Sequence, residues 1–146
     1  MGINSTWCYT VFMAGWAGGT ERVFKTAWFS KAARKALIPE DELCAAIRQV
    51  MLGQADDLGG GVFKKRLDKN RSRSIILAKG GRYWVYEYLF AKKDLDNIGE
   101  VELGKYRKLA KVYEVLTEQQ VDLLIQSESW KEICHGEEEQ IQDGCV

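Results

Sequence analysis

Residues 62–91 constrain the fold of this chain more than any other segment. They contain three short runs rich in β-branched and aromatic residues, which is the pattern of β-strands. The runs cover residues 62–67, 73–78 and 82–91. The last two are joined by a glycine-rich hairpin turn at 79–81, and residues 68–70 are also turn-forming. Three strands joined this tightly predict an antiparallel meander.

The same part of the chain is strongly basic. Between residues 60 and 93, ten Lys and Arg residues are opposed only by Asp68 and Glu87. The basic residues are Lys64, Lys65, Arg66, Lys69, Arg71, Arg73, Lys79, Arg82, Lys92 and Lys93. A sheet with this excess of positive charge is suited to meet a polyanion. Its aromatic residues could stack on bases, although Tyr83, Trp84 and Tyr86 are interpreted mostly as core packing.

The charge of the whole chain is unevenly distributed. Residues 21–113 contain 20 Lys and Arg and 12 Asp and Glu, whereas residues 114–146 contain one Lys and nine acids. The acidic end is interpreted either as a solvated tail or as a segment that folds back over the basic face. With 146 residues, the chain is long enough for one core and too short for two.

We expect three parts along the chain. Residues 1–20 contain no charged side chain and are rich in Gly and Trp. They lack the positive start of a signal peptide and are too broken by Gly to span a bilayer, so we interpret them as a poorly ordered extension. Residues 21–135 form the domain, and residues 136–146 form an acidic flexible tail. A cytoplasmic location is expected.

The remaining segments predict an α+β fold. A strand at 22–26 precedes two helices, at 28–37 and from Pro39 to Gly53, which form an N-terminal helical hairpin packed on a small antiparallel β-sheet. Residues 58–61 are read as a flexible entry to the next strand. The C-terminal part predicts a helix at 97–116, a short helix after the capping box of Thr117 and Gln120, and a last extended piece. That piece contains Trp130 and Ile133.

The cysteine and histidine residues favour neither a metal site nor disulfides. The four Cys residues are scattered without a CxxC spacing, so no zinc or other metal is expected. Nothing indicates secretion, and Cys44 is interpreted as a small core residue. His135 is the only histidine, which excludes a ribonuclease design based on a histidine pair.

The basic strands suit RNA cleavage without a metal ion. Because strand side chains alternate, Lys64 and Arg66 share one face and Lys65 takes the other, and Tyr86, Tyr88, Phe90 and Lys92 are predicted to share a face. Cations neutralise charge on a scissile phosphate, and a Lys or Tyr can transfer protons. A lysine crowded by other cations has a lowered pKa, which makes it a possible general base.

Several spaced blocks resemble the RelE/HigB-like toxins of bacterial type II toxin–antitoxin modules, over residues 22–135. The blocks are Phe24-Lys25-Thr26 with Trp28-Phe29, Leu43-Cys44-Ala45-Ala46, Leu58-Gly59-Gly60-Gly61-Val62, Lys64-Lys65-Arg66, and Phe90-Ala91-Lys92 with Asn97-Ile98. The resemblance implies a small α/β protein with two N-terminal helices on an antiparallel sheet, like the microbial ribonucleases. It also implies mRNA cleavage in the ribosomal A site and neutralisation by an antitoxin from a neighbouring gene.

The resemblance assigns roles to individual residues. The implied catalytic residues are Lys64, Arg66, Arg73 and Lys92, and Phe90 or Tyr88 would stack on an mRNA base. The other basic residues expected to bind RNA, from the charge of the sheet, are Lys65, Arg71, Arg82 and Lys93. The loop before Arg73, at 69–72, is shorter than the family's and lacks its glycines, which leaves open which arginine is aligned with the phosphate.

The expected function is therefore a metal-independent, ribosome-dependent mRNA endonuclease that blocks translation. Its expected partners are mRNA, the ribosome and a cognate antitoxin of the helix-turn-helix type, with no membrane and no small-molecule cofactor. Two alternatives stay open. One is a non-catalytic toxin of the same fold that inhibits DNA gyrase, and the other is a plain nucleic-acid-binding module.

Overall fold

The computed structural model describes residues 21–94 and 98–134, which form an α+β fold, as predicted. The strands are β1 (Arg22–Thr26), β2 (Asp56–Gly59), β3 (Val62–Leu67), β4 (Ser72–Lys79), β5 (Tyr83–Ala91) and β6 (Trp130–Ile133). The helices are α2 (Ala27–Lys35), α3 (Glu40–Met51), α4 (Glu100–Glu114) and α5 (Glu118–Gln126). The expected extension, the acidic tail and His135 lie outside the described residues. Among the described residues, no helix is long and apolar enough to cross a membrane.

The strands form one sheet in the order β2-β3-β4-β5-β1-β6. The predicted meander of β3, β4 and β5 is confirmed, with every neighbouring pair antiparallel. The sheet is mixed rather than purely antiparallel, however, because β1 pairs in parallel with β5. A parallel pair needs a long crossover, and the chain between β1 and β5 supplies one that includes α2 and α3.

The glycine-rich segment 58–61 is a tight turn rather than a flexible entry. Its first two residues complete β2, which pairs with β3 through Asp56 opposite Lys64 and Gly59 opposite Val62. Gly60 and Gly61 both have left-handed φ angles, of 65° and 84°, as a two-residue hairpin turn requires. A Cβ atom on Gly60 would also lie 3.0 Å from Cγ of Arg107 on α4. These glycines therefore set the turn and allow α4 to approach it.

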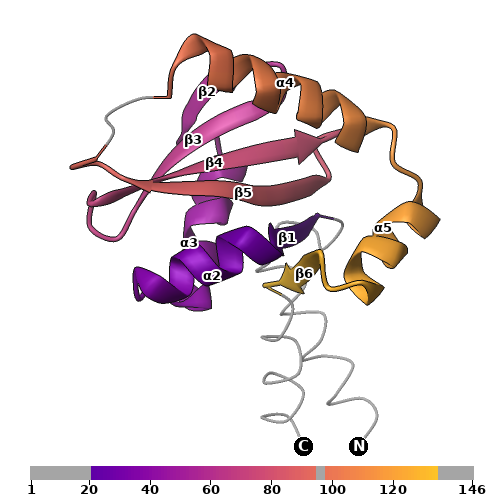
Figure 1. Ribbon diagram of the computed structural model, residues 1–146, viewed down its shortest axis with the longest axis horizontal. Helices are drawn as coiled ribbons and strands as arrows, with labels where there is room; N and C mark the ends of the chain where they lie inside the picture. Colours follow the sequence, from indigo (N-terminus) through magenta and orange to yellow (C-terminus); the bar gives the residue numbers. More distant parts are fainter. Residues whose placement is uncertain (1–20, 95–97, 135–146) are drawn as a thin grey trace, which may run out of the picture.

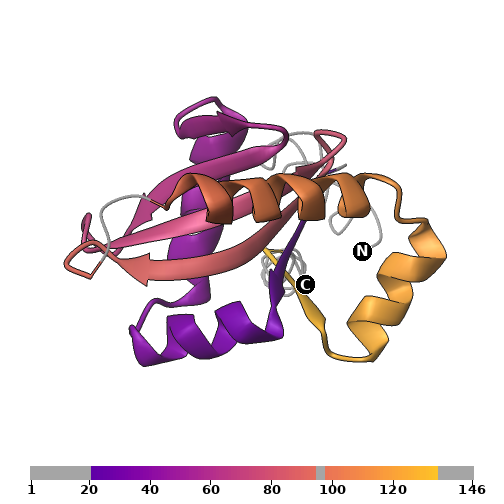
Figure 2. The same ribbon diagram turned by 45° about the horizontal axis from the view of Figure 1, so that its top comes forward.

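Helices cover both faces of the sheet. Figure 1 shows α4 over one face and α2 and α3 against the other, and Figure 2 shows α4 crossing in front of the strands. Each side has its own core of buried side chains, one beneath α2 and α3 and the other beneath α4 and α5. Trp84 and Tyr86 lie in the first core and Tyr83 in the second, so the expected packing role of these aromatic residues is confirmed.

A β-bulge in β5 changes which residues share a face. Ile76 lies opposite Tyr86 and Ile75 lies opposite Tyr88, so Glu87 is an extra residue in β5. The predicted set of Tyr86, Tyr88, Phe90 and Lys92 on one face is therefore wrong at Tyr86. That side chain is buried in the α2–α3 core, stacks 4.9 Å from Phe29 and donates a hydrogen bond to the Leu43 carbonyl at 2.7 Å.

A disulfide joins Cys44 on α3 to Cys134, directly after β6. Both residues are buried in the same core, as expected for Cys44, but the expectation of no disulfide is wrong at this pair. The two residues are 90 positions apart in the chain, and only the packing of β6 beside β1 brings them together. The capping box of Thr117 and Gln120 at the start of α5 is confirmed.

Candidate nucleic-acid interface

At one end of the sheet β3 ends, β4 begins and the chain leaves β5 toward α4 (Figure 1). Cations from these neighbouring strands and their turn lie in this part of the sequence. We call this region the basic end, and its cations are Lys64, Lys65, Arg66, Lys69, Arg71, Arg73, Lys92 and Lys93. Arg66 lies opposite Arg73, which lies opposite Phe90, and the adjacent row is Lys64, Ile75 and Tyr88. Directly opposite residues have Cβ atoms about 5 Å apart and share a face. Lys64, Arg66 and Arg73 are thus brought together on the face that carries α4.

The lysines of β3 differ in their surroundings. The Lys64 side chain is only 14% exposed, and its Nζ lies 3.5 Å from a carboxylate oxygen of Asp56. Lys65 donates a hydrogen bond to the Gln54 carbonyl at 2.8 Å. Burial, together with the charge of Arg66, lowers the pKa of Lys65. The lysine with the lowered pKa is therefore Lys65.

All three basic residues of β3 line one hollow of about 320 Å³, although Lys65 lies on the opposite face from Lys64 and Arg66. The reason is the short length of β2, whose pairing with β3 reaches only to Lys64. Beyond that point β3 is an edge strand, so side chains from both of its faces reach the same space. Arg66 is the exposed member of the three.

Arg73 is buried, with 5% of its surface exposed. Its Nη1 donates hydrogen bonds to the carbonyls of Asn70, at 3.0 Å, and Ser72, at 3.2 Å. These bonds brace the turn between β3 and β4, where Asp68, Lys69 and Asn70 have left-handed φ angles of 55°, 51° and 72°. Consecutive non-glycine residues in this conformation are strained and persist only where the surroundings hold them. Arg73 therefore positions the turn as well as adding charge.

The turn and the end of β5 line a second hollow, of about 720 Å³. Its cations are Lys69, Arg71, Lys92 and Lys93, and the backbone N–H of Lys92 donates to the Arg71 carbonyl at 2.9 Å. Arg71 pairs with Asp68 at 2.9 Å, and this hydrogen bond lowers the pKa of Asp68. Lys92 and Lys93 are exposed. Both predicted lysines thus lie at the basic end.

The structure does not bring Arg82 into this region. Arg82 lies in the turn between β4 and β5, at the opposite end of β5 from Lys92. Its guanidinium lies 5.8 Å from the centre of the Tyr83 ring. Because β5 has nine residues, roughly 30 Å of strand separates Arg82 from the basic end. Placing Arg82 among the RNA-binding residues is therefore not supported by its position.

The predicted stacking residues, Phe90 and Tyr88, are partly or fully covered by other side chains. Phe90 is 7% exposed and belongs to the core under α4. Tyr88 is half-buried, with its ring 4.9 Å from that of Trp28 at an interplanar angle of 23°. Trp28 itself is 50% exposed. Trp28 is not among the predicted RNA-binding residues. The helical period gave a signal for its exposure, because Phe29 and Ala33 define the buried face of α2.

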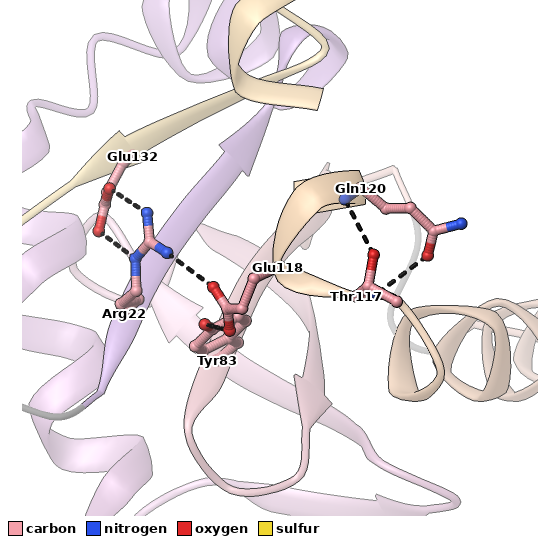
Figure 3. Close-up of polar contacts among 6 residues, drawn as sticks. All are labelled: Arg22, Tyr83, Thr117, Glu118, Gln120 and Glu132. Carbon is pink, nitrogen blue, oxygen red and sulfur yellow. Dashed lines mark hydrogen bonds and ion pairs between the residues drawn. The ribbon is translucent and has the colours of Figure 1, made fainter. Parts of the chain in front are cut away.

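The cations at the β1 and β6 edge of the sheet are neutralised by acids. Arg22 donates two hydrogen bonds to Glu132, at 2.9 and 2.8 Å, and lies 3.5 Å from Glu118 (Figure 3). The hydrogen bonds to Glu132 raise the pKa of Arg22. Tyr83 donates a hydrogen bond to Glu118, which the capping box at Thr117 and Gln120 holds at the start of α5 (Figure 3).

Two lysines at the same edge share one acid. Lys25 and Lys131 lie 3.0 and 2.9 Å from the same oxygen of Glu40. Burial alone raises the pKa of Glu40, but the hydrogen bonds from Lys131 and Lys25 lower it overall. We call this region the paired edge, made of Arg22, Lys25, Glu40, Tyr83, Glu118, Lys131 and Glu132.

Among residues 21–94 and 98–134, no group of three or more His, Cys, Asp or Glu side chains is placed to hold a metal ion.

Comparison with known proteins agrees with the arrangement of the fold. The family described as the RelE toxin of the RelE/RelB toxin–antitoxin system matches residues 21–133. The chain therefore belongs to the RelE toxin family, and its fold is that of a RelE-like protein. The family implies that the protein is the toxin of a toxin–antitoxin module with a cognate antitoxin as its partner. No curated protein and no solved structure matches the chain.

Proposed function

We propose that this RelE-family toxin is a ribosome-dependent mRNA endonuclease that blocks translation. The observation that carries the proposal is the convergence of Lys64, Arg66 and Arg73 on one face of the sheet, fixed by cross-strand register. Lys92 and Lys93 lie at the same end. This concentration of cations matches the demand of a phosphodiester whose charge increases in the transition state.

The proposed reaction uses the RNA's own 2′-hydroxyl as the nucleophile. A base removes the 2′-hydroxyl proton, the O2′–phosphorus bond forms, the bond from phosphorus to the 5′-oxygen breaks, and an acid returns a proton to that oxygen. The products are a 2′,3′-cyclic phosphate and a 5′-hydroxyl. Arg66 and Lys64 contact the phosphate oxygens, and Arg73 adds charge while it holds the turn.

Proton transfer is assigned to Lys92, at the open end of β5. Lys92 is exposed and lies with Lys93 and Arg71 along one hollow at the end of β5. Lys65, whose pKa is lowered, is the second candidate for the base. Lys65, Arg71 and Lys93 contact the RNA backbone on either side of the scissile linkage.

We also propose that the protein acts in the cytoplasm, because its proposed substrate is mRNA on ribosomes. We further propose that the cognate antitoxin is of the helix-turn-helix type and covers the basic end. Coverage would neutralise an exposed cluster that includes Arg66, Lys92 and Lys93.

A cell-free translation reaction tests the function. Wild-type protein is expected to cut the message within codons and to stop translation, whereas Lys64→Ala/Arg66→Ala is expected to leave the message intact. Arg82→Ala is the matched control, because it removes an exposed cation from the far end of β5, and it should cut like the wild type. Intact mRNA with all proteins would reject the proposal, and inhibition of gyrase supercoiling in a parallel assay would replace it with the non-catalytic alternative.

A further inference from the structure

We infer that Trp28, supported by Tyr88, is a stacking platform for an unpaired RNA base next to the phosphate held at the basic end. The inference rests on the proposed function and adds a binding subsite to it. Trp28 is exposed and lies on α2, outside the sheet. It is not one of the RNA-binding residues predicted from the strands.

The position of the ring follows from the register. Lys64, Ile75 and Tyr88 form one row across β3, β4 and β5 on the α4 face. β1 pairs with β5 only as far as Tyr86, so the edge of β5 beyond that residue is left to α2. Trp28, in the first turn of α2, extends the row outward by stacking on Tyr88 at a centroid distance of 4.9 Å. The row therefore runs from a cation to an exposed indole.

The packing behind Trp28 makes a rigid support. Tyr88 also lies 5.9 Å from the Phe90 ring and 6.0 Å from the Tyr106 ring of α4. One face of the indole thus rests on a fixed aromatic cluster, while half of the residue's surface stays exposed. A pre-positioned ring loses little conformational freedom when a base stacks on it.

The charge near the ring favours a nucleotide over an apolar partner. Phe90, the neighbour of Tyr88 in this cluster, lies opposite Arg73, which lies opposite the exposed Arg66. Lys35, seven positions after Trp28, lies on the same side of α2 and is exposed, whereas Lys31 lines a separate hollow with Glu128 and Glu132. An exposed aromatic ring set among cations is the arrangement that binds single-stranded nucleic acid, where bases stack and phosphates pair with cations.

Binding of a short RNA separates this inference from the nuclease proposal. The probe is a single-stranded RNA of about six nucleotides, within the range that small single-strand-binding sites cover. Trp28→Ala is expected to weaken binding on the order of 5- to 100-fold, the range measured for loss of one base–aromatic stack. Trp28→Phe keeps a ring and should retain most of the affinity. Leu123→Ala removes an exposed apolar side chain from α5 and should bind like the wild type.

Probes with a single abasic nucleotide complete the test. One abasic position should weaken binding to the wild type but not further weaken binding to Trp28→Ala, because the same stack is already lost. Equal effects of every abasic position on both proteins would overturn the platform even if mRNA cleavage is found. If the abasic position and Trp28→Ala are coupled in RNA binding but no mRNA is cut, the stacking platform is supported and the nuclease proposal is rejected. If Trp28→Ala binds RNA normally but is no longer neutralised by the co-expressed antitoxin, the ring belongs to a protein interface and the inference is wrong.

Discussion

The basic end and the paired edge lie in the same small sheet and use their cations in opposite ways. At the paired edge, Arg22 is held by Glu132 and Glu118, and two lysines share Glu40. At the basic end, seven cations line two hollows and Arg73 is buried between them in the strand order, while the acids in contact with this region include Asp56, Asp68 and Glu42. The difference shows that the number of cations in a region does not by itself identify a nucleic-acid-binding site. What marks the basic end, among residues 21–94 and 98–134, is an excess of cations over the acids that contact them.

The sharpest contrast between the regions comes from two arginines. Arg66→Ala is expected to lower mRNA cleavage about 100-fold, the usual loss when one donor to the transition state is removed. Its effect on stability should stay within about 0.5 kcal/mol, because Arg66 is exposed. Arg22→Ala should do the reverse, lowering the free energy of unfolding by about 2 kcal/mol through the loss of hydrogen bonds to Glu132.

Urea unfolding and the translation assay, run on both variants, measure this contrast. The contrast between the two regions would be contradicted if Arg22→Ala abolished cleavage while remaining folded, or if Arg66→Ala unfolded the protein.

The disulfide should contribute to stability without affecting the basic end. Cys44→Ala/Cys134→Ala is expected to lose about 2–4 kcal/mol of unfolding free energy, since the bond closes a long loop. RNA affinity should not change, because the bond joins α3 to the residue after β6. Urea unfolding with and without reductant measures the effect. A reductant should lower the stability of the wild type toward that of the variant, and an equal stability of all samples would contradict the role of this bond.

Lys69 offers a variant in which stability and binding change in opposite directions. Its φ of 51° costs a non-glycine residue about 1–2 kcal/mol, and glycine carries an entropic penalty of about 0.5–1 kcal/mol. Lys69→Gly should therefore stabilise the fold by about 0.5–1 kcal/mol while weakening RNA binding a few-fold through loss of one cation. Lys69→Ala, which keeps the strain, should lose the same affinity without the gain. A stability gain in both variants would remove the conformational explanation.

Glu87 gives the smallest expected effect, which is seen in the pH dependence of stability. Burial raises the pKa of Glu87, and the hydrogen bond from Tyr113 at 2.6 Å offsets this only in part. The folded state therefore binds the proton more tightly than the unfolded state. Stability contributed by the neutral acid is lost as pH rises from the ordinary value of 4.5 through the raised pKa.

Glu87→Gln should be more stable than the wild type at neutral pH, and its stability should vary less with pH across this window. Thermal unfolding at a series of pH values is the measurement. Asp122→Asn, which changes an exposed acid on α5, serves as the control and should follow the wild type. A Glu87→Gln protein that is less stable than the wild type at neutral pH would show that the carboxylate is needed as an anion.

Local patterns were sufficient for most of the elements, although not for β2, and for one half of the basic end. The meander, the first strand and the capping box at Thr117 follow from turn residues and spacing that act over a few positions. The shared face of Lys64 and Arg66 follows from strand alternation within β3 alone. These features require no knowledge of distant contacts.

The remaining features depend on long-range pairing. The bulge at Glu87 shifts the faces of β5, and its position is set by the register with β4. The burial of Arg73 depends on carbonyls of a strained turn, which charge counting does not register. Cys44 meets Cys134 only because β6 returns beside β1. Arg82 lies in the turn with Lys79, and the length of β5 separates it from the basic end. The contact of Trp28 with Tyr88 depends on the short length of β1, which leaves this edge of β5 to α2.

The salt dependence of RNA affinity tests most directly whether the exposed cations of the basic end, such as Arg66 and Lys93, bind phosphates. For a single strand, the slope of log affinity against log salt should flatten by about 0.7 for each phosphate contact removed. We predict this change for Arg66→Ala and for Lys93→Ala, and an unchanged slope for Arg82→Ala and Arg22→Ala. Equal slopes in all five proteins, including the wild type, would contradict the account.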